Sequence, residues 1–323
     1  MTRTGHEQPR AATTFDLPPL PLAAWQDTKT TLHLYAQIVG KIRMALHPKL
    51  NHWWHVTLYL SPRGLTTHAI PTGDGLIELE FDLLDHNLMI RSSDGRHKVV
   101  ALYDGLSVAQ FYHSVLGSLA QLGVEVAILA KPYDPPRVGS DLPFKEDEVH
   151  ARYDAAYVTR FWRILSWVHV ILLEFKGRFY GKSTPVHLFW HSLDLAYTRF
   201  SGREAPMQGG SPSDREAYSH EVISFGFWAG DESVSAPTFY GYTYPEPNGL
   251  RGAPLLPKQA RWVDAGGGVM ALLDYDDVRR SEDPRQTLLS FLESTYLAGA
   301  KRAGWDVEAF NHDYVDYVPL ELP

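Results

Sequence analysis

The chain has 323 residues, enough for about two domains of ordinary size, and 44% of its residues are hydrophobic, which predicts a substantial core. Its formal net charge of −8 gives no overall attraction for nucleic acid or anionic lipid, so we exclude both as expected partners. Cysteine is absent, which excludes disulfides, thiolate nucleophiles and cysteine-ligated metal sites and is compatible with the cytoplasm, where we expect the protein.

The first half is predicted to be one α+β unit. Residues 1–20 contain no continuous apolar segment and are interpreted as an extended lead-in broken by prolines, so we expect neither a secretory signal nor a membrane anchor. From Leu22 to about His47, apolar residues recur at helical spacing, and Pro48 ends the helix. Five short β-rich segments follow, as in an antiparallel meander, and a second helix ends at Gly123.

The second half repeats this order. Residues 131–150 are rich in proline, glycine and charge and are predicted to be a linker. After them we expect a helix from about Tyr153 to Tyr180, four strands, and a helix that ends near Ala303.

Two long segments without periodicity, 201–218 and 245–268, interrupt the second half. Loops of that length more often cover or form a binding site than serve only as connections. The strands come in clusters without a helix after each one, which disfavours a parallel sheet. We therefore predict an α+β fold of two related helix–meander–helix units, residues 21–130 and 151–323.

Polar residues recur along with the elements. The residues Lys41, Arg43 and His52 have the same spacing as Lys176, Arg178 and His187, and His33 corresponds to His169. Equivalent positions around a pseudo-twofold axis can converge, which predicts a ligand pocket at the seam between the halves. The alternative is architectural, because a histidine that binds the same neighbouring backbone in each copy would be repeated for folding alone.

Histidines in residues 186–200 are candidate metal ligands. If this segment is one regular strand, His187 and His191 share a face while Asp194 points to the other. Two histidines four residues apart lie ~13 Å from each other on a strand, so the spacing is a weak metal signal. We name His52, His187 and His191 as candidate ligands of a divalent metal, the one cofactor considered.

A candidate acid–base group opens the following strand at His220 and Glu221. Antiparallel pairing with the preceding strand would bring both residues near Arg199. An arginine beside a carboxylate and a histidine can bind an anionic or carbonyl substrate and transfer a proton. This predicts a small-molecule enzyme of hydrolase or lyase type, with His220, Glu221 and Arg199 as catalytic residues. The alternative is a buried ion-pair network that fixes the hairpin.

Aromatic residues suggest a second hypothesis. Tyr240, Tyr242 and Tyr244 alternate along one strand, and Trp228 lies in the strand before, so the rings could hold an apolar or planar ligand in a non-catalytic binding module. Core packing also explains such rings, and a purely structural or regulatory role is a third hypothesis. The candidate ligand-binding residues are His52, His187, Asp194, Tyr242, Tyr244 and Trp228. The sequence predicts no oligomeric state.

Several passages resemble a known family: HLFWHSLDLAYTRFSGR, YSHEVISFGFWAGD and FYGYTYPEP, with LNHWWHVTLYL and GLTT in the first half. From about Trp25 to Trp305 the chain resembles an uncharacterised family of bacterial proteins classed as a domain of unknown function. The resemblance implies a soluble bacterial protein but no particular activity. The resemblance implies that the characteristic segments of the family contain six polar residues of this chain: His52, His187, Asp194, Arg199, His220 and Glu221.

Overall fold

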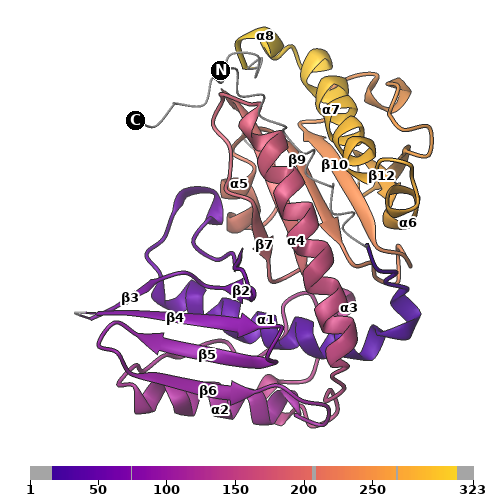
Figure 1. The fold of residues 1–323 in the computed structure, drawn as a ribbon. Helices are drawn as coiled ribbons and strands as arrows, with labels where there is room; N and C mark the ends of the chain where they lie inside the picture. Colours follow the sequence, from indigo (N-terminus) through magenta and orange to yellow (C-terminus); the bar gives the residue numbers. More distant parts are fainter. Residues whose placement is uncertain (1–16, 74, 206–208, 267, 311–323) are drawn as a thin grey trace, which may run out of the picture.

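The computed structural model describes residues 17–310 except 74, 206–208 and 267, so the lead-in over residues 1–16 and the last residues of the second predicted unit lie outside the described residues. It contains two six-stranded antiparallel sheets, each preceded and followed by helices (Figure 1). The predicted α+β class is therefore confirmed.

The first half runs from helix α1 (Gln26–Leu46) to helix α2 (Val108–Gln121), with the short turn η1 (Leu22–Ala24) ahead of it. Its strands are β1 (Tyr59–Leu60), β2 (Gly64–Thr66), β3 (Ile70–Thr72), β4 (Gly75–Asp82), β5 (Asn87–Ser92) and β6 (His97–Ala101). They pair in the order β1-β2-β4-β5-β6, and β3 also pairs with β4. In β4 the buried Ile77, Leu79 and Phe81 alternate with Glu78 and Glu80, so one face of the sheet joins the core.

The second half begins with helix α4 (Ala155–Gly177), which lies along its sheet in Figure 1. Its strands are β7 (His187–Phe189), β8 (Asp194–Glu204), β9 (His220–Trp228), β10 (Thr238–Tyr244), β11 (Arg261–Ala265) and β12 (Gly268–Asp274). They pair in the order β11-β12-β10-β9-β8-β7. The helices that follow or interrupt them are α5 (Pro212–Ala217), η4 (Leu250–Gly252), α6 (Tyr275–Arg279), α7 (Pro284–Arg302) and α8 (Val307–Phe310).

Both segments predicted as loops contain regular structure. The segment 201–218 carries the end of β8 and helix α5, and the segment 245–268 carries η4 and strand β11. The sheet therefore has six strands where four were predicted. Within the described residues, no helix is both long and apolar enough to cross a membrane.

Helix α1 is buried on nearly all sides, because it packs between the first half and the start of the second sheet. It contacts α2, α3 (Pro135–Val138) and α4. Two of its polar side chains contact the linker or the second half: Gln37 exchanges hydrogen bonds with the backbone of Tyr133, and Lys41 lies over the ring of Trp190. Burial of these groups fixes how the two halves pack together.

The predicted linker, residues 131–150, packs against the first half. It contains α3 and the turn η3 (Phe144–Glu146), which contacts α2, and both Phe144 and Asp147 are fully buried. Asp147 accepts hydrogen bonds from the backbone and the imidazole of His150. This segment is therefore an ordered connection between α2 and α4.

The two halves are joined by a pair of backbone hydrogen bonds. Leu58 N donates to Leu188 O at 2.9 Å, and Leu188 N donates to Leu58 O at 2.7 Å. Leu188 follows His187 directly, whereas His52 lies well before Leu58, in the turn η2 (Asn51–Trp53). His52 and His187, whose spacing predicted equivalent positions, therefore lie at different places in the fold.

Candidate functional site

Residues 186–200 form a hairpin and not the single strand that was predicted. Strands β7 and β8 are connected by a tight turn in which Leu193 has a φ of 53°. His187 lies opposite Ala196, and side chains directly opposite each other share a face. Arg199 is an odd number of positions from Ala196, so it lies on the other face of the sheet from His187.

His220 and Glu221 also lie on opposite faces of the sheet, because side chains alternate along β9. Glu221 accepts hydrogen bonds from Arg203 Nε and from Trp305 Nε1, both at 2.9 Å. It lines a small hollow of about 190 Å³ together with Tyr244. The predicted His220–Glu221 acid–base pair is therefore wrong.

Arg199 lies inside the core and is only 1% exposed. Its guanidinium donates to Phe175 O at 2.5 Å and lies 3.6 Å from the Phe175 ring centroid and 4.4 Å from that of Tyr296. Burial lowers its pKa. The side chain fills an aromatic cage beneath the sheet and has no access to a substrate, so the predicted substrate-orienting role of Arg199 is wrong.

The three candidate metal ligands are not brought together. His187 is fully buried, and burial lowers its pKa to about 3, with Arg43 and Lys176 acting in the same direction. His191 lies on the other side of Phe189, and His52 belongs to a different cluster. Over the described part of the chain, no group of three or more histidine, aspartate or glutamate side chains is arranged to hold a metal ion.

The predicted aromatic wall does form on the His220 face of the second sheet. Tyr240 and Tyr242 stack with centroids 6.3 Å apart and 15° between their planes, and Trp228 lies 5.7 Å from Tyr240. The Tyr242 hydroxyl is 2.8 Å from that of Tyr218, whose ring packs against Tyr244. These hydroxyls thus have protein partners, and the wall is part of a network.

Asp194 is held at one end of this wall. Its carboxylate accepts hydrogen bonds from the hydroxyls of Ser192 and Tyr240, and it is 7% exposed. The pKa of Tyr240 is raised, first by burial and then by the charge of Asp194, so the phenol stays protonated and donates. Asp194 is thereby positioned by two donors within the sheet.

At the other end of the wall, His52 and His220 meet across the two halves of the chain. Their ring centroids are 5.4 Å apart, with the planes at 75°. His52 has a φ of 54° and Trp53 a φ of 60°, a left-handed conformation that costs a side-chain-bearing residue of order 1–3 kcal/mol. Strain of this kind persists where the surrounding structure holds a side chain in place. Here that side chain is the imidazole of His52.

Lys182 completes a group that we call the histidine–lysine cluster: His52, Lys182 and His220. Lys182 Nζ lies 3.1 Å from His52 Nε2, and His52 Nδ1 lies 3.4 Å from Ala217 O. Because an ammonium can only donate, we assign His52 as neutral with its proton on Nδ1. Burial and the charge of Lys182 both lower the pKa of His52, which agrees with this assignment.

His220 has one ring nitrogen free to accept a proton. Its Nδ1 lies 3.0 Å from the Ser219 hydroxyl, which itself donates to Glu216 O at 2.9 Å. The hydroxyl hydrogen is thus used, so we assign the Nδ1 proton to His220 as the donor to Ser219 Oγ. The Nε2 atom of His220 is then an acceptor with no hydrogen bond to any other described residue.

Aromatic rings surround the cluster. The Phe200 ring centroid lies 4.8 Å from that of His52 and 5.1 Å from Lys182 Nζ, and the Trp54 ring centroid lies 5.5 Å from Lys182 Nζ. Both rings can attract the ammonium of Lys182, although this side chain is exposed to solvent. Sequence reasoning missed Lys182, which lies in the irregular connection between α4 and β7 and belongs to no motif.

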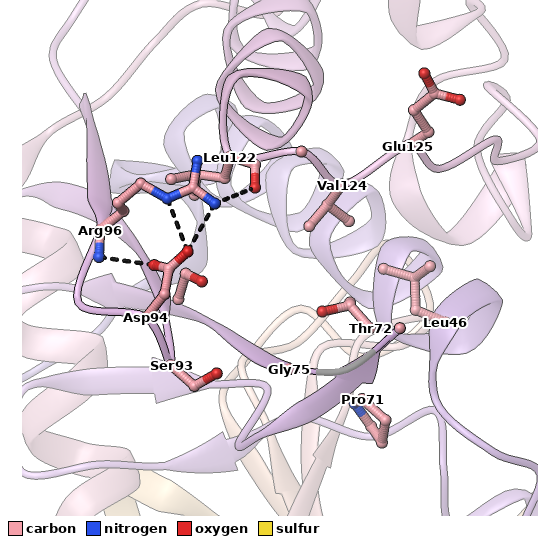
Figure 2. A pocket seen from close by; sticks show the side chains of 13 residues that line it. Leu46, Pro71, Thr72, Gly75, Ser93, Asp94, Arg96, Leu122, Val124 and Glu125 are labelled. Carbon is pink, nitrogen blue, oxygen red and sulfur yellow. Dashed lines mark hydrogen bonds and ion pairs between the residues drawn. The ribbon is translucent and has the colours of Figure 1, made fainter.

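A larger hollow, of about 630 Å³, lies elsewhere, at the end of the first sheet (Figure 2). Two of its three charged residues bind each other: Arg96 pairs with Asp94 at 2.7 Å and donates to Leu122 O at 3.0 Å. The third, Glu125, is exposed to solvent. Because the one cation of this hollow is already compensated, the histidine–lysine cluster is the stronger candidate site.

Comparison with known proteins gives a family but no activity. A model of a family of unknown function (DUF5996) matches residues 17–312, nearly the whole chain, and the chain belongs to this family. No curated protein and no solved structure matches the chain significantly. The matched range includes the positions of all three residues of the histidine–lysine cluster.

Proposed function

We propose that this member of the DUF5996 family is a small-molecule enzyme of hydrolase or lyase type, in which His220 transfers a proton at Nε2. The main support for this proposal is the contact between His52 and His220, which come from the two halves of the chain. Their ring centroids lie 5.4 Å apart, beside Lys182. A neutral imidazole with a free nitrogen, next to a cation, has the parts that general acid–base chemistry requires.

The proposed roles differ from those predicted from the sequence. Lys182 takes the role that was assigned to Arg199 and binds an anionic or carbonyl group of the substrate. His52 is a positioning residue, because its Nε2 accepts a hydrogen bond from Lys182 and its ring packs against His220. Glu221 has no part in the mechanism, since its partners are Arg203 and Trp305.

The experiment is a rate comparison over panels of esters, lactones, amides and phosphomonoesters. The variants are His220→Gln and a control, His97→Gln, which changes an exposed histidine of β6 in the other sheet. We expect turnover of one class by the wild type, a loss of about 10²–10⁴-fold in His220→Gln, and no change in the control. Equal rates in the wild type and His220→Gln, or no turnover of any class, would contradict the proposal.

We also propose that the two halves arose by duplication of one unit. Each half has the order helix, six antiparallel strands, helix, and the two meet through the paired backbones of Leu58 and Leu188. On this proposal the cluster lies at a seam between related units, where ligand sites commonly form.

A further inference from the structure

Lys182 is a cation without a counterion. Among residues 17–310, with the gaps noted above, no carboxylate forms an ion pair or a hydrogen bond with Lys182, and one of its three ammonium hydrogens goes to a neutral imidazole. Glu204 lies opposite His220 in the strand register but makes no hydrogen bond or ion pair with it. The cluster thus combines one fixed positive charge with two titratable imidazoles and no fixed negative charge in contact.

The other lysines near this site differ. Lys49 also lies over a ring, that of Trp53 at 5.4 Å, but it pairs with Glu216 at 2.8 Å. Lys176 donates to Ser183 Oγ at 2.7 Å and to Thr184 O at 3.0 Å. Lys182 therefore has an aromatic environment in common with Lys49 but lacks the carboxylate that compensates it.

We propose that Lys182 binds an oxyanion group of the substrate, which makes the site selective for small molecules that carry a phosphate or a carboxylate. Two ammonium hydrogens remain for the anion, because the third is donated to His52 Nε2. This inference rests on the proposed function, since it assigns the substrate class of the same site. The charge of Lys182 helps to lower the pKa of His52, so an anion that neutralises this charge raises the pKa of His52.

The test follows the imidazole NMR signals of His52 and His220, identified with His52→Asn and His220→Gln. The probe is inorganic phosphate, titrated against sodium chloride of equal ionic strength. We expect a saturable shift of these signals and a rise in the pKa of His52, an affinity at least tenfold lower in Lys182→Met, and wild-type behaviour in Lys49→Met. Both lysines are exposed, so neither change removes a core residue. Acetate replaces phosphate in a second arm, where saturation extends the class to carboxylates and its absence restricts the class to phosphates.

The inference is overturned if the phosphate response does not saturate, or if it is the same in Lys182→Met as in the wild type. Because this readout needs no turnover, it separates the two proposals. Lys182-dependent phosphate binding without catalysis in any panel would support the substrate class and contradict the enzyme. Turnover of an uncharged ester at equal rates in the wild type and Lys182→Met would support the enzyme and contradict the substrate class.

Discussion

Tyr240 reaches Asp194 by passing over Gly226. Tyr240 is on β10 and Asp194 on β8, and the intervening strand β9 has a glycine where the phenol crosses it. A Cβ added to Gly226 would lie 2.5 Å from Leu195 O and closer still to the Tyr240 hydroxyl. The absence of a side chain at this position therefore permits the hydrogen bond between the outer strands.

We expect Gly226→Ala to destabilise the protein by about 1–3 kcal/mol, because the phenol or the backbone of β8 must move. The measurement is the free energy of unfolding in urea, with near-ultraviolet circular dichroism to follow the packing of Tyr240 and Trp228. A variant as stable as the wild type would show that Tyr240 does not lie across Gly226.

Gly117 is the matched comparison. It lies within α2, is exposed, and a Cβ there would meet no atom within 4 Å. Since glycine in a helix interior is less favourable than alanine by about 0.5–1 kcal/mol, we expect Gly117→Ala to stabilise the protein by that amount. Opposite signs for the two glycine substitutions, measured in the same urea titration, are the expected result, and destabilisation by Gly117→Ala would contradict this account of the helix.

The helix–sheet class could be predicted because periodicity reports which face of an element is buried. The alternation in β4 does mark a buried face, whereas the apolar spacing of α1 marks only a helix, because α1 is buried on nearly all sides. The turn within residues 186–200 was missed, because Leu193 adopts a positive φ that its residue type does not indicate. That one turn reverses the chain and separates His187 from Arg199.

The site was predicted only in part. His52 and His220 were both named, but their meeting depends on the left-handed backbone of His52 and Trp53, which no pattern of residues encodes. The separation of His220 from Glu221 follows from strand alternation and could have been predicted. No sequence pattern marks Lys182, because its proposed role depends on the side chains that surround it in the folded protein.

The aromatic cage of Arg199 gives a prediction that separates structural from catalytic roles. A buried cation without a hydrogen-bonded carboxylate gains little over an apolar side chain of similar size. We expect Arg199→Met to keep the free energy of unfolding within about 1 kcal/mol of the wild type or to raise it, whereas Arg199→Ala, which leaves a cavity, costs about 2–5 kcal/mol. Loss of phosphate binding in a stably folded Arg199→Met would instead assign Arg199 to the site.

The role of the His52 imidazole can be tested separately from the strained, left-handed backbone of this residue. Asparagine tolerates the left-handed conformation better than most residues, so we expect His52→Asn to keep the turn η2 and remain folded. Without the acceptor at Nε2, Lys182 loses its hydrogen bond, and we expect phosphate affinity to fall while the free energy of unfolding changes by less than about 1 kcal/mol. The NMR titration used for Lys182→Met measures the first quantity and a urea titration the second. Unchanged phosphate affinity would remove His52 as a positioning residue.

Two buried histidines should make the fold sensitive to acid. Burial lowers the pKa of both His33 and His187 to about 3, with the charge of Lys29 acting on His33 and those of Arg43 and Lys176 on His187. Above pH 6.5 each histidine is neutral in both the folded and the unfolded state. Below pH 6.5 the two histidines become protonated in the unfolded state, whereas in the folded state they stay neutral down to about pH 3. Stability is therefore complete above pH 6.5 and is lost toward pH 3, at about 1.4 kcal/mol per pH unit for each histidine.

The measurement is the free energy of unfolding in urea at pH 7, 5.5 and 4.5. We expect His187→Leu, which keeps an apolar side chain in the core, to reduce the slope between pH 5.5 and 4.5 by about 1.4 kcal/mol per pH unit. Replacing the exposed His97 with leucine is the control and should leave the slope unchanged. If His187→Leu and the wild type lose stability at the same rate, then His187 accepts a proton in the folded protein, and the interior around it is open to water.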